Sequence, residues 1–197
     1  EIRNCHIDNA HSGYGLCQLH GARDIFFHDI SAKGGVTLRL ETGAGGLYEG
    51  VYDIRAVNVC NCNGRAAVLM QPHCSSNGKV AVDSVYSNSS SFAVLIHAGF
   101  LDRHHKNNPD ARPGVYASDS YINHVHAVYG DKAQVDCKEV YLAEERNYGK
   151  YKPSEFAPHE SMTGPSLAAV YDTTDGSYRV TVNDVTSEGF SPTRSSI

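Results

Sequence analysis

The chain has 197 residues, of which 41% are hydrophobic and 20% are charged, and its formal net charge is −5 at pH 7. This charge argues against a protein that binds nucleic acid through broad electrostatic attraction. The sequence contains no apolar run of about 18 residues, so it predicts no membrane-spanning helix. We expect a monomer that associates with neither nucleic acid nor membrane.

Four segments in the first half of the chain share one pattern. Each begins with alternating aliphatic residues, passes a corner rich in Asn, Gly or Ser, and ends with a second alternating run. The segments are Ile2–Leu19, Ile25–Leu40, Ile54–Met70 and Val80–Ile96. When Ile7, Ile30, Val59 and Val85 are taken as equivalent, the steps between them are 23, 29 and 26 residues. Repeats of this length without a helical pattern predict an all-β right-handed parallel β-helix of the pectin-lyase-like type.

The repeats also suggest how the chain is divided. We expect one β-helix domain over residues 1–190, with loops inserted at about 99–114 and 147–165 and a tail at 191–197. Solenoids protect their open ends with polar caps, and this chain opens within a strand pattern. We therefore expect it to be the C-terminal part of a longer solenoid.

The segment from Gly34 to Gly43 alternates apolar and polar side chains with a period of two, which predicts a strand. Val36, Leu38 and Leu40 are expected to point inward, and Thr37, Arg39 and Glu41 outward. An arginine and a glutamate on one open face suit a surface that works on carbohydrate. An ordinary solvated strand face is the alternative.

The six cysteines permit fifteen pairings, among which the sequence does not choose. Cys60, Cys62 and Cys74 lack the paired Cys-x-x-Cys knuckles of a structural zinc site. Buried thiols are the expected state, with a Cys62–Cys74 bridge as the alternative if the protein is secreted. We expect no required metal or cofactor, although structural calcium or sodium remains an alternative.

Basic residues suggest an anionic polysaccharide as the partner. Guanidinium groups match the planar oxygens of sulfate and carboxylate groups, and a tyrosine ring can stack on a sugar. Scattered, solvated charges are the alternative. The expected substrate-binding residues are Arg39, Arg65, Arg103, His105, Lys106, Arg112 and Tyr14.

Three segments resemble the iota-carrageenases: His11–Leu19, Gly34–Thr42 and Gln71–His73. The resemblance implies a secreted β-helical glycoside hydrolase that cleaves the β-1,4 bonds of a sulfated algal galactan with inversion. It implies that Glu41 is the proton donor, that Gln18 helps to hold the attacking water, and that His73 lines the site.

The spacing provides a separate argument for this pair. Gln18 and Glu41 each lie 11 residues after their markers, Ile7 and Ile30, so we expect them to stack in one column. An amide at that distance can orient water or fix the carboxyl group. Arg39 lies on the same face and favours the ionised carboxylate unless a bound sulfate engages it.

The chain departs from the family at Gly43, where the usual general base is an aspartate two residues after the acid. Two residues along a strand span ~6.6 Å, close to the ~6.5–9.5 Å that an inverting pair needs. Asp102, Glu49 and His73 are alternative bases. The alternative functions are a polysaccharide lyase acting on a uronate-containing glycan and a β-helix that binds glycan without cleaving it.

Overall fold

The computed structural model describes residues 1–41, 49–71, 76–96, 114–128, 170–172 and 179–188, without the side chains of residues 9, 11–14 and 170–172. All of the regular structure in these ranges is β. The strands are β1 (Ile2–Leu19), β2 (Ala22–Leu40), β3 (Val51–Cys62), β4 (Ala66–Met70), β5 (Val80–Asn88), β6 (Phe92–Ile96), β7 (Ser120–Val128), β8 (Val170–Asp172), β9 (Val180–Val182) and β10 (Val185–Glu188). No helix in this part of the chain is long and apolar enough to cross a membrane.

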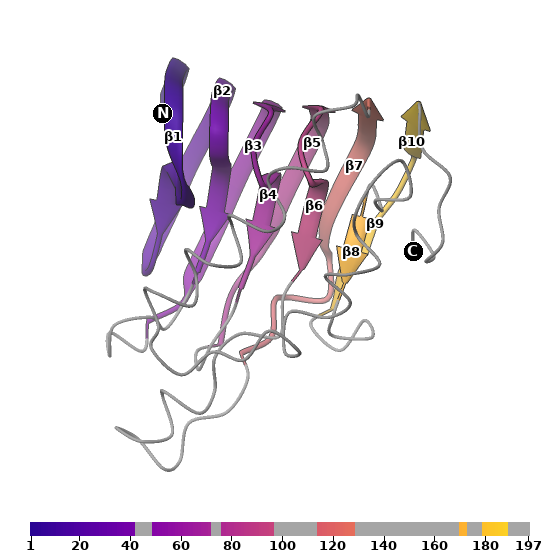
Figure 1. Cartoon of the computed structure of the whole chain (residues 1–197). Coiled ribbons are helices and arrows are strands. Elements are labelled where there is room, and N and C mark those ends of the chain that lie inside the picture. Colours follow the sequence, from indigo (N-terminus) through magenta and orange to yellow (C-terminus); the bar gives the residue numbers. More distant parts are fainter. Residues whose placement is uncertain (42–48, 72–75, 97–113, 129–169, 173–178, 189–197) are drawn as a thin grey trace, which may run out of the picture.

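The strands form two stacked layers, and every pairing between them is parallel. The first layer runs from β1 and β2 through β3, β5 and β7 to β9 and β10. The second runs from the ends of β1 and β2 through β4 and β6 to β8. β1 and β2 therefore belong to both layers. Figure 1 shows the successive coils side by side along one axis, which confirms the predicted parallel β-helix.

The repeat lengths were predicted correctly for two of the three steps. Ile30 pairs with Val59, and Val59 with Val85. The first equivalence was wrong, because Ile30 pairs with Cys5, and Ile7 pairs with Ala32. The physical reason lies in β1, whose register shifts twice between Ile7 and Gly15. These irregularities are not visible as a break in the sequence pattern.

One residue in each coil has a left-handed backbone at the same place in the first layer. The strand pairing skips this position, so the residues stack in a column of bulges. Asn and Asp tolerate this conformation better than other non-glycine residues do. In the column, the Asn58 amide also donates a 2.8 Å hydrogen bond to Asp29 Oδ1. The column comprises Asn4, Asp29, Asn58, Ser84, His124 and Asp184, with φ between 51° and 59°.

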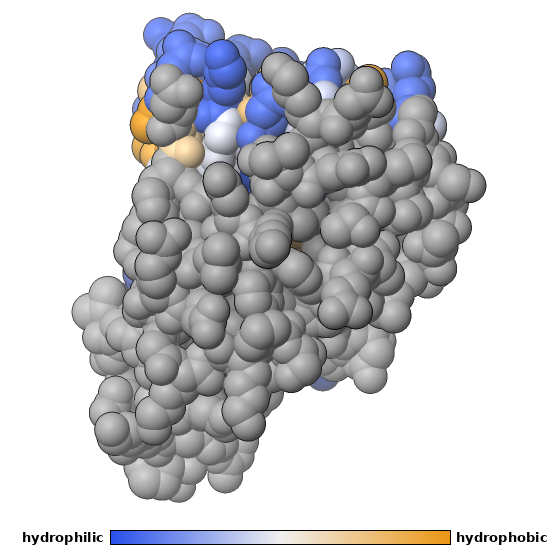
Figure 2. Space-filling model, viewed as in Figure 1, coloured by the Kyte–Doolittle hydropathy of each residue, from blue (hydrophilic) through white to orange (hydrophobic). Residues whose placement is uncertain are grey.

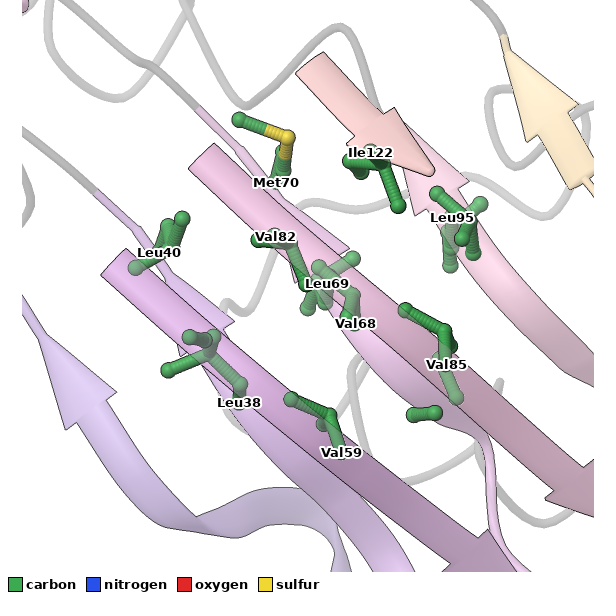
Figure 3. Close-up of a cluster of buried hydrophobic side chains, with 14 of the residues drawn as sticks. Leu38, Leu40, Val59, Val68, Leu69, Met70, Val82, Val85, Leu95 and Ile122 are labelled. Atoms are coloured by element: carbon green, nitrogen blue, oxygen red, sulfur yellow. The ribbon is translucent and has the colours of Figure 1, made fainter. Parts of the chain in front are cut away.

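The core fills the space beside the second layer. All five residues of β4 and all five of β6 are buried, which leaves neither face of these strands exposed. In-register stacking makes continuous apolar columns, and part of this cluster is drawn in Figure 3. The columns are Leu38–Val68–Val94 and Leu40–Met70–Ile96.

The corner between the layers is held by buried polar groups. The Thr37 hydroxyl donates to the Cys60 carbonyl oxygen at 2.6 Å and accepts from the Asn61 amide at 3.0 Å. Asn61 in turn accepts from the Ser90 hydroxyl at 2.7 Å. Thr37 is fully buried, so the expectation that it faces solvent was wrong. Its hydroxyl is satisfied by the neighbouring coil instead of by water.

Histidine–carboxylate pairs link coils on the exposed side of the first layer. His124 Nδ1 lies 2.8 Å from Asp83 Oδ1, and His124 Nε2 lies 3.5 Å from Asp184 Oδ2. The hydrogen bond to Asp83, followed by the charges of Asp83 and Asp184, raises the pKa of His124. In Figure 2 the described residues visible above the grey region are mostly hydrophilic, and apolar ones appear at the edge beside β1.

The bulge column generates a stability prediction. Asn58→Val should lower the free energy of unfolding by about 1–2 kcal/mol, because a β-branched residue resists a left-handed backbone. Asn58→Gly should cost less, since only the hydrogen bond to Asp29 is lost. Chemical denaturation measures both, with the exposed strand position Arg55→Val as the control. Equal losses for the valine and glycine variants would contradict the role of the backbone.

The raised pKa of His124 generates a pH prediction. Its contribution to stability is fully present below the ordinary pKa of 6.5 and is lost as the pH rises through the higher folded value. His124→Asn keeps a residue that tolerates the left-handed backbone and removes the imidazole. Denaturation curves should separate the parent from this variant at pH 5.5 and bring them together at pH 9. A difference that grows with pH would contradict the assignment.

Candidate active site

Polar side chains from neighbouring coils meet where the strands of the second layer end. Gln18 pairs with Arg39, and Leu19 pairs with Leu40. Backbone hydrogen bonds continue the strand pairing one residue further. The Glu41 N–H donates to the Leu19 carbonyl oxygen at 3.0 Å, and the Gln71 N–H donates to the Leu40 carbonyl oxygen at 2.8 Å. Because side chains alternate, residues two apart share a side. The polar block therefore comprises Gln18, His20, Arg39, Glu41 and Gln71.

Glu41 lies at the centre of this polar block. Its Oε2 accepts a hydrogen bond from Gln18 Nε2 at 3.0 Å and lies 2.8 Å from Arg39 Nη2. The predicted column of Gln18 over Glu41 was wrong in register, because Gln18 is paired with Arg39. The Gln18 amide instead reaches Glu41 diagonally. The predicted contact between the two side chains is therefore present, although the spacing argument for it was not correct.

Arg39 and Glu41 are buried, with 0% and 1% of their side chains exposed. Arg39 Nη2 also donates to Gln71 Oε1 at 3.3 Å. The expectation that Arg39 and Glu41 occupy an open face of the strand was wrong. Tyr116 comes from a later coil and donates from its hydroxyl to the Leu40 carbonyl at 3.4 Å, so a later part of the chain packs against the end of β2. Buried polar residues can alternate with apolar ones exactly as solvated residues do, so the pattern could not distinguish them.

The polar block is suited to holding a negative charge. A buried carboxylate is stable only when it is paired and hydrogen-bonded, and Glu41 has both a guanidinium and an amide donor. The same contacts favour the ionised form of Glu41. Gln18 and His20 are only partly buried, so they form the more accessible side of the polar block.

One of the three alternative bases lies at this end of the coils. A Cβ built on Gly21 would lie 2.9 Å from the Cβ of Glu49 and 3.2 Å from its Oε2. Gly21 directly follows His20, and the side chain of Glu49 is exposed. The absence of a side chain at Gly21 therefore makes room for a second carboxylate beside the polar block. Asp102 and His73 lie outside the described residues, as does Gly43.

The predicted substrate-binding residues are not all brought together. Arg65 is buried at 2% exposure, and its backbone N–H donates to Gly35 O at 2.7 Å in the corner before β4. Gln71 follows the other end of β4, roughly 20 Å away at the rise of a β-strand. Tyr14 lies in β1 with an undescribed side chain. Arg103, His105, Lys106 and Arg112 lie outside the described residues.

The described cysteines are partly buried thiols that form no disulfide. Cys5, Cys17, Cys60 and Cys62 are free, so Cys62 is not in a bridge. Burial, followed by Cys5, raises the pKa of Cys17 to about 11. Within the described ranges no group of three or more His, Cys, Asp or Glu side chains is placed to hold a metal ion.

Sequence reasoning missed His20 and Gln71. Gln18 Nε2 lies 2.8 Å from His20 Nε2, and Gln71 contacts Arg39. The sequence did contain a signal for His20. Gln18 and His20 are polar residues two positions apart, and so are Arg39 and Glu41 in the next coil. Residues two apart share one side of a strand, so two such pairs in adjacent coils are expected to lie close together. The correct register of β1 was needed to use it.

The buried ion pair generates a stability prediction. Arg39→Met should lower the free energy of unfolding by about 3–5 kcal/mol, because it leaves the carboxylate of Glu41 buried without its cation. Adding Glu41→Gln to that variant should restore much of the loss. Chemical denaturation of the four proteins of the double-mutant cycle measures the coupling, with Arg55→Met as an exposed control. Additive losses would contradict a coupled pair.

Comparisons with known proteins agree on one family. An iota-carrageenase of Zobellia galactanivorans is 37% identical over 133 residues, which cover 66% of this chain and 26% of that protein. A solved 1,3-alpha-1,4-beta-D-galactose-4-sulfate-3,6-anhydro-D-galactose-2-sulfate 4 galactohydrolase matches with a TM-score of 0.66 and 25% identity, over 98% of this chain and 55% of that one. A solved iota-carrageenase complexed to iota-carrageenan fragments matches with a TM-score of 0.69 and 24% identity, with the same coverage.

The matches cover only part of each relative. The chain spans about a quarter of the length of the curated relatives it matches and about half of the solved structures. No protein-family model matches it. Within the shared part, both the sequence and the parallel β-helix agree with the same group of proteins. Over this shared part the chain is similar to iota-carrageenases.

Proposed function

We propose that the protein is a secreted glycoside hydrolase that cleaves β-1,4 bonds of an iota-carrageenan-like sulfated galactan with inversion. The observation that carries the proposal is the 3.0 Å contact between Gln18 and Glu41. The family resemblance assigned to these two residues the roles of water holder and acid. The two residues come from adjacent coils and are in direct contact, and this contact supports a common site for the reaction.

In this mechanism Glu41 gives its proton to the glycosidic oxygen, and Gln18 orients the attacking water. Arg39, 2.8 Å from Glu41, balances the charge left on the carboxylate after the proton has gone. The acid must first be protonated, which Arg39 opposes while the ion pair is intact. A substrate sulfate that draws the guanidinium of Arg39 away would favour the protonated carboxyl group.

Inversion requires a second group that activates water on the opposite face of the sugar. Glu49 is a described carboxylate whose side chain would lie within 3.2 Å of a Cβ built on Gly21, next to His20. Its exposed side chain is free of the ion pair that holds Glu41, which suits a base in contact with solvent. Asp102 and His73 remain the alternatives.

A glycan-binding β-helix without catalysis is a second candidate. The observations that favour it are the burial of Glu41 at 1% exposure and its ion pair with Arg39. Gly43, which can accept no proton, points the same way. Such a protein would retain sulfated galactan and produce no new chain ends.

The test compares the parent with Glu41→Gln on a panel of sulfated and uronic polysaccharides. We expect reducing ends from iota-carrageenan and a loss of about 100-fold or more in the variant, because an amide cannot donate the proton. The control is Glu188→Gln, which changes an exposed glutamate on β10.

Three other outcomes would contradict the proposal. Equal cleavage by the parent and Glu41→Gln would remove Glu41 from the reaction. Polymer retention without new ends would favour the binding β-helix. Growth of ultraviolet absorbance from an unsaturated product would establish a lyase instead.

A further inference from the structure

We infer that His20, unprotonated on Nε2, is a positioning residue that holds the Gln18 amide against Glu41, and that its protonation turns the reaction off at acid pH. The inference rests on the proposed function and adds to it a residue and a pH dependence.

The hydrogen-bond chemistry of Gln18 fixes the state of His20. Gln18 Nε2 lies 3.0 Å from Glu41 Oε2 and 2.8 Å from His20 Nε2. The amide must present nitrogen to Glu41, since its oxygen would set two acceptors against each other. An amide nitrogen only donates, so His20 Nε2 must accept. His20 is therefore neutral here, with its proton on Nδ1.

Both N–H groups of Gln18 are used by these two contacts. The amide plane is thus held at two points, one on each side of its nitrogen. The remaining polar atom, Oε1, is an acceptor and can receive a hydrogen from an attacking water. Fixing such an amide in advance lowers the entropy cost of orienting the water.

A proton on His20 Nε2 would break this arrangement. Two donors would then face each other, and the Gln18 amide would have to turn over. The turned amide would set its oxygen against Glu41 Oε2, so either orientation loses one contact. Protonation of His20 therefore uncouples Gln18 from the carboxylate that the reaction uses.

The charged groups around His20 determine how its protonation affects the contact with Gln18. His20 directly follows β1, and its contact on that coil is Gln18. On the next coil, Glu41 lies across the Gln18 amide and is paired with Arg39. Glu49 approaches from the Gly21 side. A cationic His20 would be drawn to either carboxylate, which competes directly with its contact to Gln18.

The test uses two substitutions of His20 in the full protein. His20→Gln places an amide oxygen at a similar reach, an acceptor that does not titrate, whereas His20→Ala removes the acceptor. In the parent, kcat/KM on iota-carrageenan should fall when acid protonates His20. His20→Gln should keep kcat at neutral pH within about 3-fold and lose this acid limb. His20→Ala should lower kcat about 10-fold and leave KM nearly unchanged.

The control is His28→Gln, which removes an imidazole bound to Glu1 and Asp29 on the exposed side of the fold. Its pH profile should match that of the parent. An acid limb in His20→Gln that is identical to the parent's would overturn the inference while leaving the proposed function intact. An unchanged kcat in His20→Ala would do the same.

Nuclear magnetic resonance of protein labelled with ¹⁵N at histidine tests the contact without any activity. We expect the Nε2 of His20 to carry no proton at neutral pH and its signal to change in Gln18→Leu. A proton on Nε2 would overturn the inference. If the contact is confirmed and no protein cleaves carrageenan, the proposed function fails, and with it the catalytic role of His20.

Discussion

Parallel, in-register stacking of coils is the constraint on which the rest of the structure depends. Stacking at ~4.8 Å places each side chain directly above its equivalent in the coil before. The apolar columns through Leu38 and Leu40 follow from it, as does the column of left-handed residues through Asn58. The polar block has the same origin, because Gln18 can meet Glu41 only when β1 and β2 are held in register.

The sequence was sufficient to predict the parallel β-helix and two of its three repeat steps. It was insufficient where a strand is locally irregular, or where a segment distant in sequence packs against the site. The equivalence of Ile7 and Ile30 failed because β1 shifts register between Ile7 and Gly15. The exposure of Arg39 and Glu41 was wrong because alternation shows which residues share a side and does not show what covers them. The role of Tyr116, 76 residues beyond Leu40, could not be read from local pattern.

At the candidate site the family resemblance named a pair of residues that are in contact, whereas the spacing argument for the same pair used an incorrect strand register. The resemblance paired Gln18 with Glu41, and their contact is present. The geometric argument reached the same pair through an incorrect register. Once that register is corrected, it brings His20 and Gln71 into the polar block, and neither had been assigned a role in the site. Correct strand pairing is therefore more informative about this site than the spacing between any two of its residues.

The coils differ in the length of chain between the end of the second layer and the start of the next first layer. Two residues, His20 and Gly21, make this connection after β1, whereas ten residues lie between Leu40 and Val51. The strands on both sides keep the same alignment despite this difference. Connections of new length and composition can therefore be exchanged at this end without disturbing the ladder that positions Glu41. A chain built in this way can vary these connections while Gln18, Arg39 and Glu41 stay in contact.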